Sequence, residues 1–187
     1  ERQYTISSLL SDINLLSITV EKVGLFSGAL FDLEIGQKLL VSAPFGFFYP
    51  TQKMQNIIFI AGGIGVVPFY AFLKNFHHNP YADKNIHLLY SNKKCASIPF
   101  IKELNLLSNI HTRLNISYHV TQEMKHGTSK NTIFERINES HIKNISFATD
   151  LNTYYFICGS FKFVTDMTQV IRKIGIRDEQ IYTELFY

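Results

Sequence analysis

An apolar run that ends in a glycine-rich turn constrains this chain more than any other feature. Residues 57–61 are all apolar, Gly62, Gly63 and Gly65 follow, and Pro68 stands in the next apolar segment. A continuous apolar run is typical of a buried parallel strand. Proline is tolerated in the first turn of a helix, where its missing N–H group has no partner to lose. Glycine allows a ligand close to the backbone, and a helix N-terminus attracts phosphate. The pattern therefore predicts strand, phosphate-binding turn and helix.

Two other interpretations of this region remain open at this stage. An ordinary strand–helix turn can have the same composition without binding a ligand. The run 54–73 carries no charge and is long enough for a membrane helix, but Gln55, Asn56, the glycines and Pro68 argue against one. The spacing also differs from the dehydrogenase fingerprint, because Pro68 stands where the third glycine belongs.

Composition excludes several broad classes of protein. The chain has 187 residues, of which 46% are hydrophobic and 18% charged, so it can build a core and is not typical of a disordered chain. A net charge of +3 is too small to indicate nucleic-acid binding. Cys95 and Cys158 are too few for a disulfide framework, so we expect reduced thiols and a cytoplasmic protein. No histidine, cysteine and carboxylate spacing indicates a metal site.

Strand and helix patterns alternate after Pro50. Five segments are predicted as strands, at residues 57–61, 86–90, 114–120, 154–158 and 180–184. The segments between them are predicted as helices, at residues 66–76, 99–107, 132–137 and 163–174. This alternation predicts a doubly wound five-stranded parallel sheet with helices on both faces, in a domain that covers residues 51–187.

Residues 1–50 have a different pattern and are predicted to form a separate, partial antiparallel barrel. Alternating residues predict strands at 2–8, 15–23 and 38–42, and a short helix at 27–33 with Ser27 as its N-cap. Three strands are too few to close a barrel. We therefore expect that the chain is a fragment or that earlier barrel strands are missing.

Two short motifs in this first region have side chains suited to a nucleotide. Arg2 and Tyr4 lie on one face of the predicted strand and offer a cation and an aromatic ring, while Thr5 lies on the other face and offers a hydroxyl. Gly24 and Ser27 form a second glycine turn that leads into a helix. Taken alone, the residues of the first motif are more common on an ordinary surface strand than in a flavin site, whereas the second motif fits an ordinary N-cap as well as a phosphate site.

A third motif closes the next-to-last predicted strand. Cys158 and Gly159 stand at its carboxyl end, where open α/β sheets bind their ligands. Cys158 is therefore predicted to face the crevice. The alternative is that Cys158 is a small buried apolar residue, which is the usual environment of a lone cysteine.

These motifs, in this order, resemble those of the ferredoxin–NADP⁺ reductase superfamily. Residues 2–5 resemble its Arg-x-Tyr-Ser/Thr flavin motif, and residues 24–30 its flavin-phosphate segment. Residues 61–68 resemble its nicotinamide-pyrophosphate loop, and residues 90–93 its adenosine-ribose segment. Residues 44–46 resemble the end of its barrel, and residues 183–186 resemble its terminal segment. Cys158-Gly159 with Met167 resembles its Cys-Gly-Pro…Met stretch, although Ser160 replaces the usual proline.

The resemblance implies an enzyme that transfers a hydride between NAD(P)H and FAD. It implies that Arg2, Tyr4, Thr5, Gly24 and Ser27 bind the flavin nucleotide. Residues implied to bind the nicotinamide nucleotide are Gly62, Gly63, Gly65, Pro68, Ser91, Lys93 and Gly159. Tyr187 is implied to cover a flavin face or the adenine.

The same resemblance implies catalytic roles and an electron acceptor. Thr5 is expected to orient the flavin, Cys158 to pack near the reacting carbon of the nicotinamide, and Glu184 to orient the nicotinamide or relay a proton. Single electrons are then expected to pass to an iron–sulfur protein or a similar carrier. The choice between NADH and NADPH stays open, because the segment 91–94 lacks a clear 2′-phosphate signature.

Two rival functions also stay open. The chain can be a non-catalytic nucleotide-binding or electron-transfer subunit whose partner completes the barrel. It can also be a flavin-independent NAD(P) dehydrogenase, although no residue cluster provides the general acid or base that such an enzyme needs.

Overall fold

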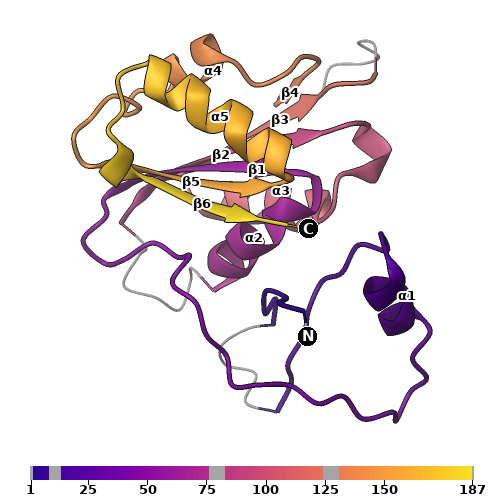
Figure 1. The fold of residues 1–187 in the computed structure, drawn as a ribbon. Helices are drawn as coiled ribbons and strands as arrows, with labels where there is room; N and C mark the ends of the chain where they lie inside the picture. The colour runs from indigo at the N-terminus through magenta and orange to yellow at the C-terminus, as the bar shows by residue number, and fades with distance from the viewer. Residues whose placement is uncertain (1, 9–13, 76–82, 124–130, 187) are drawn as a thin grey trace.

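A six-stranded parallel sheet forms the larger part of the protein, shown by a computed structural model that describes residues 2–8, 14–75, 83–123 and 131–186 (Figure 1). The strand order is β4-β3-β2-β1-β5-β6, and every neighbouring pair is parallel. The strands are β1 Asn56–Gly62, β2 Asn85–Asn92, β3 Leu114–Val120, β4 Thr132–Ile133, β5 Thr153–Gly159 and β6 Ile181–Leu185. The chain runs outward from β1 to β4 and then crosses to β5, so the order reverses between β1 and β5.

Helices cover both faces of this sheet. α2 (Val67–Lys74) and α3 (Ile101–Ile110) pack on one face, and α4 (Glu139–Lys143) and α5 (Phe161–Lys173) on the other (Figure 1). Successive residues of a strand point to opposite faces, so β1 supplies side chains to both cores. Ile57, Phe59 and Ala61 enter the α2–α3 core, while Ile58 and Ile60 enter the α4–α5 core. The predicted doubly wound parallel sheet is therefore confirmed.

The region around β4 differs from the sequence prediction. Residues 132–137 were expected to form a helix, but Thr132 and Ile133 pair with β3 and add a sixth strand to the sheet. The helix begins later, at Glu139, because the Asn138 side chain caps it by accepting hydrogen bonds from the Ser140 and His141 amides. The helix prediction for 132–137 was therefore wrong, since the edge of the sheet takes up the β-branched residues.

The N-terminal segment has little regular structure. Its helix, α1, spans Leu25–Phe31, and an isolated antiparallel bridge joins Ile6 to Ile18. The strands predicted at 2–8 and 15–23 are reduced to this bridge, and residues 38–42 form no strand. A strand needs a hydrogen-bonded neighbouring strand, and the described part of this region contains too few segments that pair with one another.

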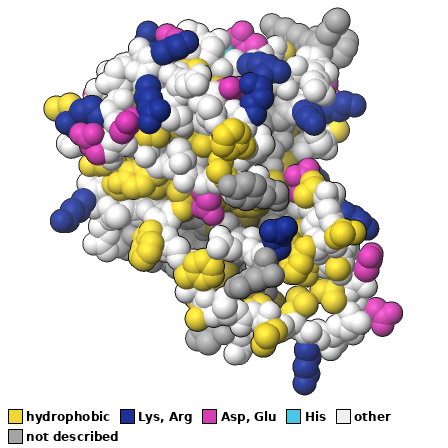
Figure 2. Space-filling model, in the orientation of Figure 1, with side chains coloured by type: hydrophobic (Ala, Val, Ile, Leu, Met, Phe, Trp, Pro, Cys, Tyr) yellow, Lys and Arg dark blue, Asp and Glu magenta, His cyan; other side chains and the backbone are white. Residues whose placement is uncertain are grey.

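This segment also exposes much of its apolar surface. Figure 2 shows hydrophobic side chains gathered over the lower lobe, where the N-terminal segment lies. Leu25, Ile35 and Leu40 are almost fully exposed, and Phe45 and Phe47 are mostly exposed. An apolar pocket of about 340 Å³ lies in the same region. Its walls are formed by Ile18, Val20, Leu30, Phe31, Leu33 and Leu39. Such a contiguous apolar surface is typical of an interface.

Two contacts fix the end of this segment against the α/β domain. The Phe48 ring packs against Phe69 of α2 and Phe156 of β5, at centroid distances of 5.8 and 5.5 Å. The buried Lys84 ammonium donates hydrogen bonds to the carbonyl oxygens of Gln52, at 2.7 Å, and Met54. These contacts attach the segment that leads into β1 to the start of β2 and to the core. Within the described residues, no helix is both long and apolar enough to cross a membrane.

A buried histidine lies beneath α4. His119 of β3 is fully buried, its Nδ1 lies 3.3 Å from the Glu135 carbonyl oxygen, and its ring packs edge-on against His141. His119 Nε2 has no hydrogen-bond partner among the described residues. Burial, with the neighbouring His141, lowers the pKa of His119 to about 4. Burial also lowers the pKa of His87, on the neighbouring strand, to about 4.

We expect stability to fall as the pH drops from 6.5 to 4. The unfolded chain binds a proton to His119 near pH 6.5, whereas the folded protein binds it only near pH 4. Stability is therefore complete above pH 6.5 and is lost below it, by about 2 kcal/mol at pH 5 for this side chain. Urea unfolding of the protein and of His119→Leu at pH 7.5 and 5 measures this loss. A pH dependence that is the same in both proteins contradicts the assignment.

Candidate functional site

The glycine turn lies at the carboxyl end of β1, where the strand order reverses. Gly63–Val66 forms a 3₁₀ turn, and α2 follows with Pro68 as its second residue. In open α/β sheets, ligands bind outside the carboxyl ends of the strands at such a reversal. The turn is therefore in the position that the phosphate-binding prediction requires.

Three of the glycines are needed for close packing inside the protein. A Cβ atom on Gly65 would lie 2.4 Å from the Cys158 carbonyl oxygen and 2.7 Å from the Gly159 nitrogen. On Gly62 or Gly159, a Cβ atom would lie 2.9 or 2.8 Å from the Phe163 ring. Gly65 therefore brings the turn against the end of β5, and contact with a ligand is not what demands a glycine there.

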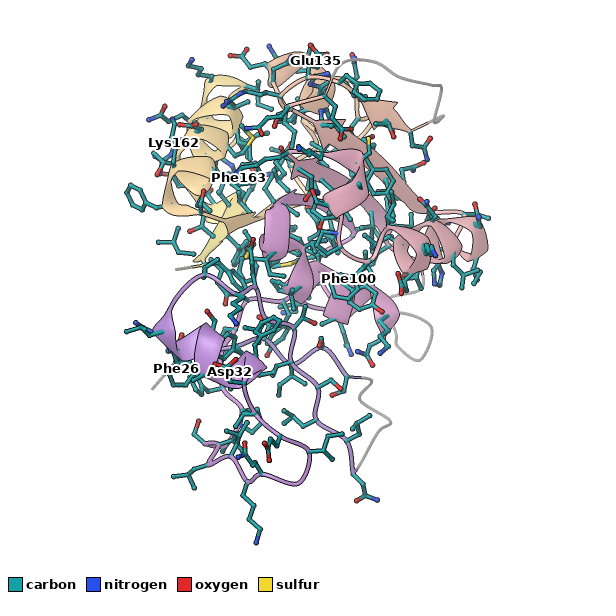
Figure 3. All side chains as sticks on the ribbon, turned by 90° about the vertical axis from the view of Figure 1, so that its right-hand side faces the viewer. Phe26, Asp32, Phe100, Glu135, Lys162 and Phe163 are labelled. Carbon is teal, nitrogen blue, oxygen red and sulfur yellow. The ribbon has the colours of Figure 1, made fainter. Side chains whose placement is uncertain are left out.

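Phe163 closes one side of this site. It belongs to the first turn of α5, and its ring lies against both Gly62 and Gly159 (Figure 3). The N-terminus of α5 is capped by Ser160, whose Oγ accepts a hydrogen bond from the Phe163 amide at 3.4 Å. The sequence analysis placed Phe163 in a helix but gave it no role. Its place beside two glycines becomes evident only when β1 and β5 are paired.

Gly63 is the glycine that faces open space. Its φ angle is +55°, in the left-handed region, and among the described residues other than its two chain neighbours no atom lies within 4 Å of the position that its Cβ would take. The first turn of α2 carries no acidic side chain. A phosphate can therefore approach the backbone at Gly63 without meeting a side chain or a negative charge from this helix.

Cys158 and Glu184 lie side by side on the α2 face of the sheet. They are register partners between β5 and β6, and Cys158 is fully buried whereas Glu184 is half-buried. Burial first, and then the Glu184 carboxylate, raises the pKa of the Cys158 thiol. Burial also raises the pKa of Glu184. Burial therefore favours the neutral form of both the Cys158 thiol and the Glu184 carboxyl group.

The β2 end holds the residues predicted for the adenosine ribose. Ser91 is half-buried beside Gly62 of β1, and Lys93 is exposed in the loop that follows β2. Glu123, which the sequence analysis did not select, also contacts this loop: the Cys95 amide donates a hydrogen bond to Glu123 Oε2 at 3.1 Å. No sequence spacing pointed to Glu123, because the contact joins two loops that only strand pairing brings together.

Arg2, Tyr4 and Thr5 lie in the N-terminal segment. Arg2 is exposed, whereas Tyr4 and Thr5 are half-buried, and the Tyr4 ring stacks on Phe26 of α1 at 6.2 Å. The Tyr4 ring is therefore held against α1. Among the described residues no hydrogen bond joins Thr5 to Cys158 or Glu184.

The N-cap assignment of Ser27 was wrong. Gly24 is the N-cap of α1, and Ser27 is its third residue. Ser27 Oγ accepts hydrogen bonds from the Val23 and Gly24 amides, both at 3.0 Å, and donates one to the Gly24 carbonyl oxygen. The hydroxyl thus shapes the turn from inside the helix. Tyr187, which was expected to cover a cofactor ring, lies outside the described residues.

Comparison with known proteins identifies the family. Residues 59–169 match the family model of the oxidoreductase NAD-binding domain. The chain belongs to this family. The matched region runs from β1 into α5 and contains the glycine turn, the β2 end and Cys158.

Proteins with similar sequences are longer than this chain. A flavohemoprotein of Rhodopirellula baltica is 28% identical over 171 residues, which are 87% of this chain and 40% of the relative. NADH-cytochrome b5 reductase 1 of Dictyostelium discoideum is 28% identical over 171 residues, which are 90% of this chain and 58% of the relative. The chain thus spans about half the length of these relatives.

Solved structures share the fold. The cytochrome b5 reductase domain of Ulva prolifera nitrate reductase has a TM-score of 0.85 and 24% identity, over 98% of this chain and 78% of that one. A ferredoxin NADP⁺ reductase of Neisseria gonorrhoeae, solved with FAD and NADP, has a TM-score of 0.73 and 21% identity, over 100% and 80%. The fold that the resemblance to the ferredoxin–NADP⁺ reductase superfamily implied is therefore confirmed, and the family model supports its NAD-binding domain.

Substitutions at Gly65 and Gly63 distinguish a glycine that internal packing requires from a glycine that lets a ligand approach the backbone. Gly65→Ala is expected to destabilise the protein by about 3 kcal/mol or more, because its Cβ collides with backbone atoms. Gly63→Ala costs roughly 1–2 kcal/mol for the left-handed conformation, while its methyl group enters the open space and weakens NADH binding about tenfold. Urea unfolding and calorimetric titration measure the two effects. Unchanged NADH affinity in Gly63→Ala contradicts the phosphate assignment.

Proposed function

We propose that this chain is part of a FAD-dependent NAD(P)H oxidoreductase that passes electrons to a carrier protein. The observation that supports this most directly is the glycine turn at the strand-order reversal of an oxidoreductase NAD-binding domain, with Cys158 and Glu184 beside it. The names of the relatives support the same chemistry, because they include NADH-cytochrome b5 reductases and flavohemoproteins.

The nicotinamide nucleotide fits the crevice over β1 and β5. Its pyrophosphate lies over the backbone at Gly63, between the 3₁₀ turn and the start of α2, where the structure leaves open space. The adenosine lies toward the β2 end, near Ser91 and Lys93, and the nicotinamide toward Cys158 and Glu184. When both nucleotides are bound, the cofactors themselves supply hydride transfer, and the protein supplies alignment and electrostatics.

Residues 1–50 belong to a FAD-binding barrel in this proposal, and residues 51–187 form the NAD(P)-binding domain. The side chains of the first region fit a flavin nucleotide: Arg2 is an exposed cation, and Tyr4 is an aromatic ring held by Phe26. Arg2 binds the pyrophosphate and Tyr4 lies against a planar ring. The exposed apolar side chains of this region are covered when the barrel is complete.

Three side chains align the reacting groups and move protons. Thr5 donates a hydrogen bond that orients the flavin ring. Cys158 packs as a neutral thiol beneath the nicotinamide and does not form a covalent bond, consistent with its raised pKa. Glu184, whose pKa is raised by burial, orients the nicotinamide carboxamide or relays a proton.

The electron acceptor in this proposal is an iron–sulfur protein or another electron carrier, such as a haem protein. Flavohemoproteins and cytochrome b5 reductases are relatives by name, and haem is therefore the acceptor that these names favour. A cytoplasmic location is part of the proposal, supported by two cysteine thiols that are both free.

A second candidate is a non-catalytic electron-transfer or nucleotide-binding subunit. The exposed apolar surface of the N-terminal segment favours this candidate, because a partner chain can cover it as well as a barrel can.

Absorbance spectroscopy distinguishes the two functions. The purified chain is mixed with FAD and freed of unbound nucleotide, and NADH or NADPH is then added under anaerobic conditions. Retained flavin bands that bleach on addition support the oxidoreductase. A chain that binds NADH but retains no FAD favours the subunit, and a chain that binds neither nucleotide contradicts both functions.

Cys158→Ala is expected to slow flavin reduction more than it weakens nucleotide binding. The thiol fills a buried position beside Glu184, so its loss shifts the nicotinamide without removing a contact to phosphate. We expect the reduction rate to fall about tenfold and the Kd for NADH to change less than twofold. Stopped-flow reduction measures the rate, and Cys95→Ala is the matched control. An unchanged rate of flavin reduction in Cys158→Ala would mean that the thiol contributes only to packing.

A further inference from the structure

One short segment carries the chain from the N-terminal segment into the sheet. It covers residues 48–55, and we call it the joint. Figure 1 shows the chain rising through this connection from the N-terminal segment, at the bottom of the view, to the sheet. In the proposed function, Thr5 lies before the joint, whereas Cys158 and Glu184 lie after it. The distance between the two reacting groups therefore depends on how the joint is held.

The second part of the joint is a closed turn that is tied to the start of β2. The Met54 amide donates a hydrogen bond to the Thr51 carbonyl oxygen at 3.2 Å. The Lys84 ammonium group donates to the carbonyl oxygens of Gln52, at 2.7 Å, and Met54. Lys84 is only 1% exposed. A buried charge is costly unless it is hydrogen-bonded, so moving the turn away from β2 would take two acceptors from a buried cation.

The first part of the joint is anchored by an aromatic ring. The Phe48 ring packs against Phe69 of α2 and Phe156 of β5. Phe69 lies in the helix that follows the glycine turn, and Phe156 stands two residues before Cys158, on the same face of β5. The joint is thus fixed to the two elements that carry the glycine turn and Cys158.

A longer contact joins the first predicted strand to the same helix. Asn75, the C-cap of α2, donates a side-chain hydrogen bond to the carbonyl oxygen of the buried Ser8 at 3.5 Å. Strong hydrogen bonds of this kind measure about 2.7–3.2 Å. We therefore expect this contact to follow the orientation that the joint sets.

We propose that Lys84 and Phe48 are positioning residues that hold the two halves of the chain in the orientation that flavin reduction requires. This inference rests on the proposed function, because it assumes that the first half binds flavin and the second half binds the nicotinamide nucleotide. Both side chains act through the backbone of the joint. A misplacement of about 1 Å between reacting groups can slow a reaction roughly a hundredfold. NADH binding uses the glycine turn, which lies wholly in the second half, so it does not depend on the joint.

Stopped-flow reduction of the FAD-loaded chain at saturating NADH, with a separate titration of NADH binding, tests the proposal. Lys84→Met keeps an unbranched side chain of similar length and removes the donors, and Phe48→Leu keeps an apolar side chain and removes the ring. We expect each variant to lower the limiting rate of flavin reduction about tenfold and to change the Kd for NADH less than about twofold.

A matched control separates orientation from stability. Ile171→Ala opens a fully buried position of α5, on the face of the sheet opposite to Phe48. It is expected to lower stability and to leave the limiting rate within about twofold.

Limited digestion with trypsin examines the joint without either cofactor. Lys53 is exposed, and it lies in the turn that Lys84 ties to β2. We expect cleavage after Lys53 to be at least about tenfold faster in Lys84→Met than in the unaltered chain and in Ile171→Ala, because local opening of the turn exposes it to the protease. Equal cleavage rates in the three proteins would show that Lys84 does not hold the turn.

The outcomes separate this inference from the proposed function. If Lys84→Met and Phe48→Leu reduce FAD as fast as the unaltered chain does, the positioning role is wrong while the oxidoreductase stands. Equal slowing in Ile171→Ala also contradicts the role, because the loss then follows stability. If Lys84→Met does not fold, Phe48→Leu decides alone. If the unaltered chain retains no FAD, the proposed function fails and this inference fails with it.

Discussion

The architecture of the site depends on one close contact between two backbones. Gly65 lies so near the Cys158 and Gly159 backbone that a single methyl group would come within 2.4 Å of a carbonyl oxygen. This contact sets the turn after β1 against the end of β5, at the place where the strand order reverses. Two residues before it, Gly63 has a left-handed conformation and faces open space among the described residues. The proposed phosphate-binding surface thus lies next to a packing contact that requires glycine.

The nucleotide-binding half was largely predictable from the sequence, and the reason is physical. A strand such as β1 is buried on both faces, so its sequence is apolar without interruption and its neighbours are glycines. β3 was predicted with the bounds that the structure has, and the other main strands within a few residues. Cys158 and Glu184 were selected separately, and the parallel register between β5 and β6 places them side by side.

The failures have physical causes of a different kind. β4 has only two residues, and its identity depends on pairing with β3, which a local pattern does not contain. Ser27 has the residue type of an N-cap, but its hydroxyl reaches back from the third helical position to two amides. Glu123 was missed because its contact with the Cys95 amide links two loops, and no spacing along the chain indicates it. Both β4 and the position of Glu123 depend on contacts between residues that are far apart in the sequence, and only the tertiary structure brings these residues together.

The two halves of the chain differ in how much of their own apolar surface they bury. The α/β half has two complete cores, one on each face of the sheet, and therefore has the hydrophobic burial that an independent fold needs. The N-terminal segment has one short helix and one bridge, and Leu25, Ile35 and Leu40 remain almost fully exposed. The proposed nucleotide site at the glycine turn lies in the α/β half. The proposed flavin-binding residues 2–5 lie in the segment with the exposed apolar surface, so the two proposed binding activities depend on separate parts of the chain.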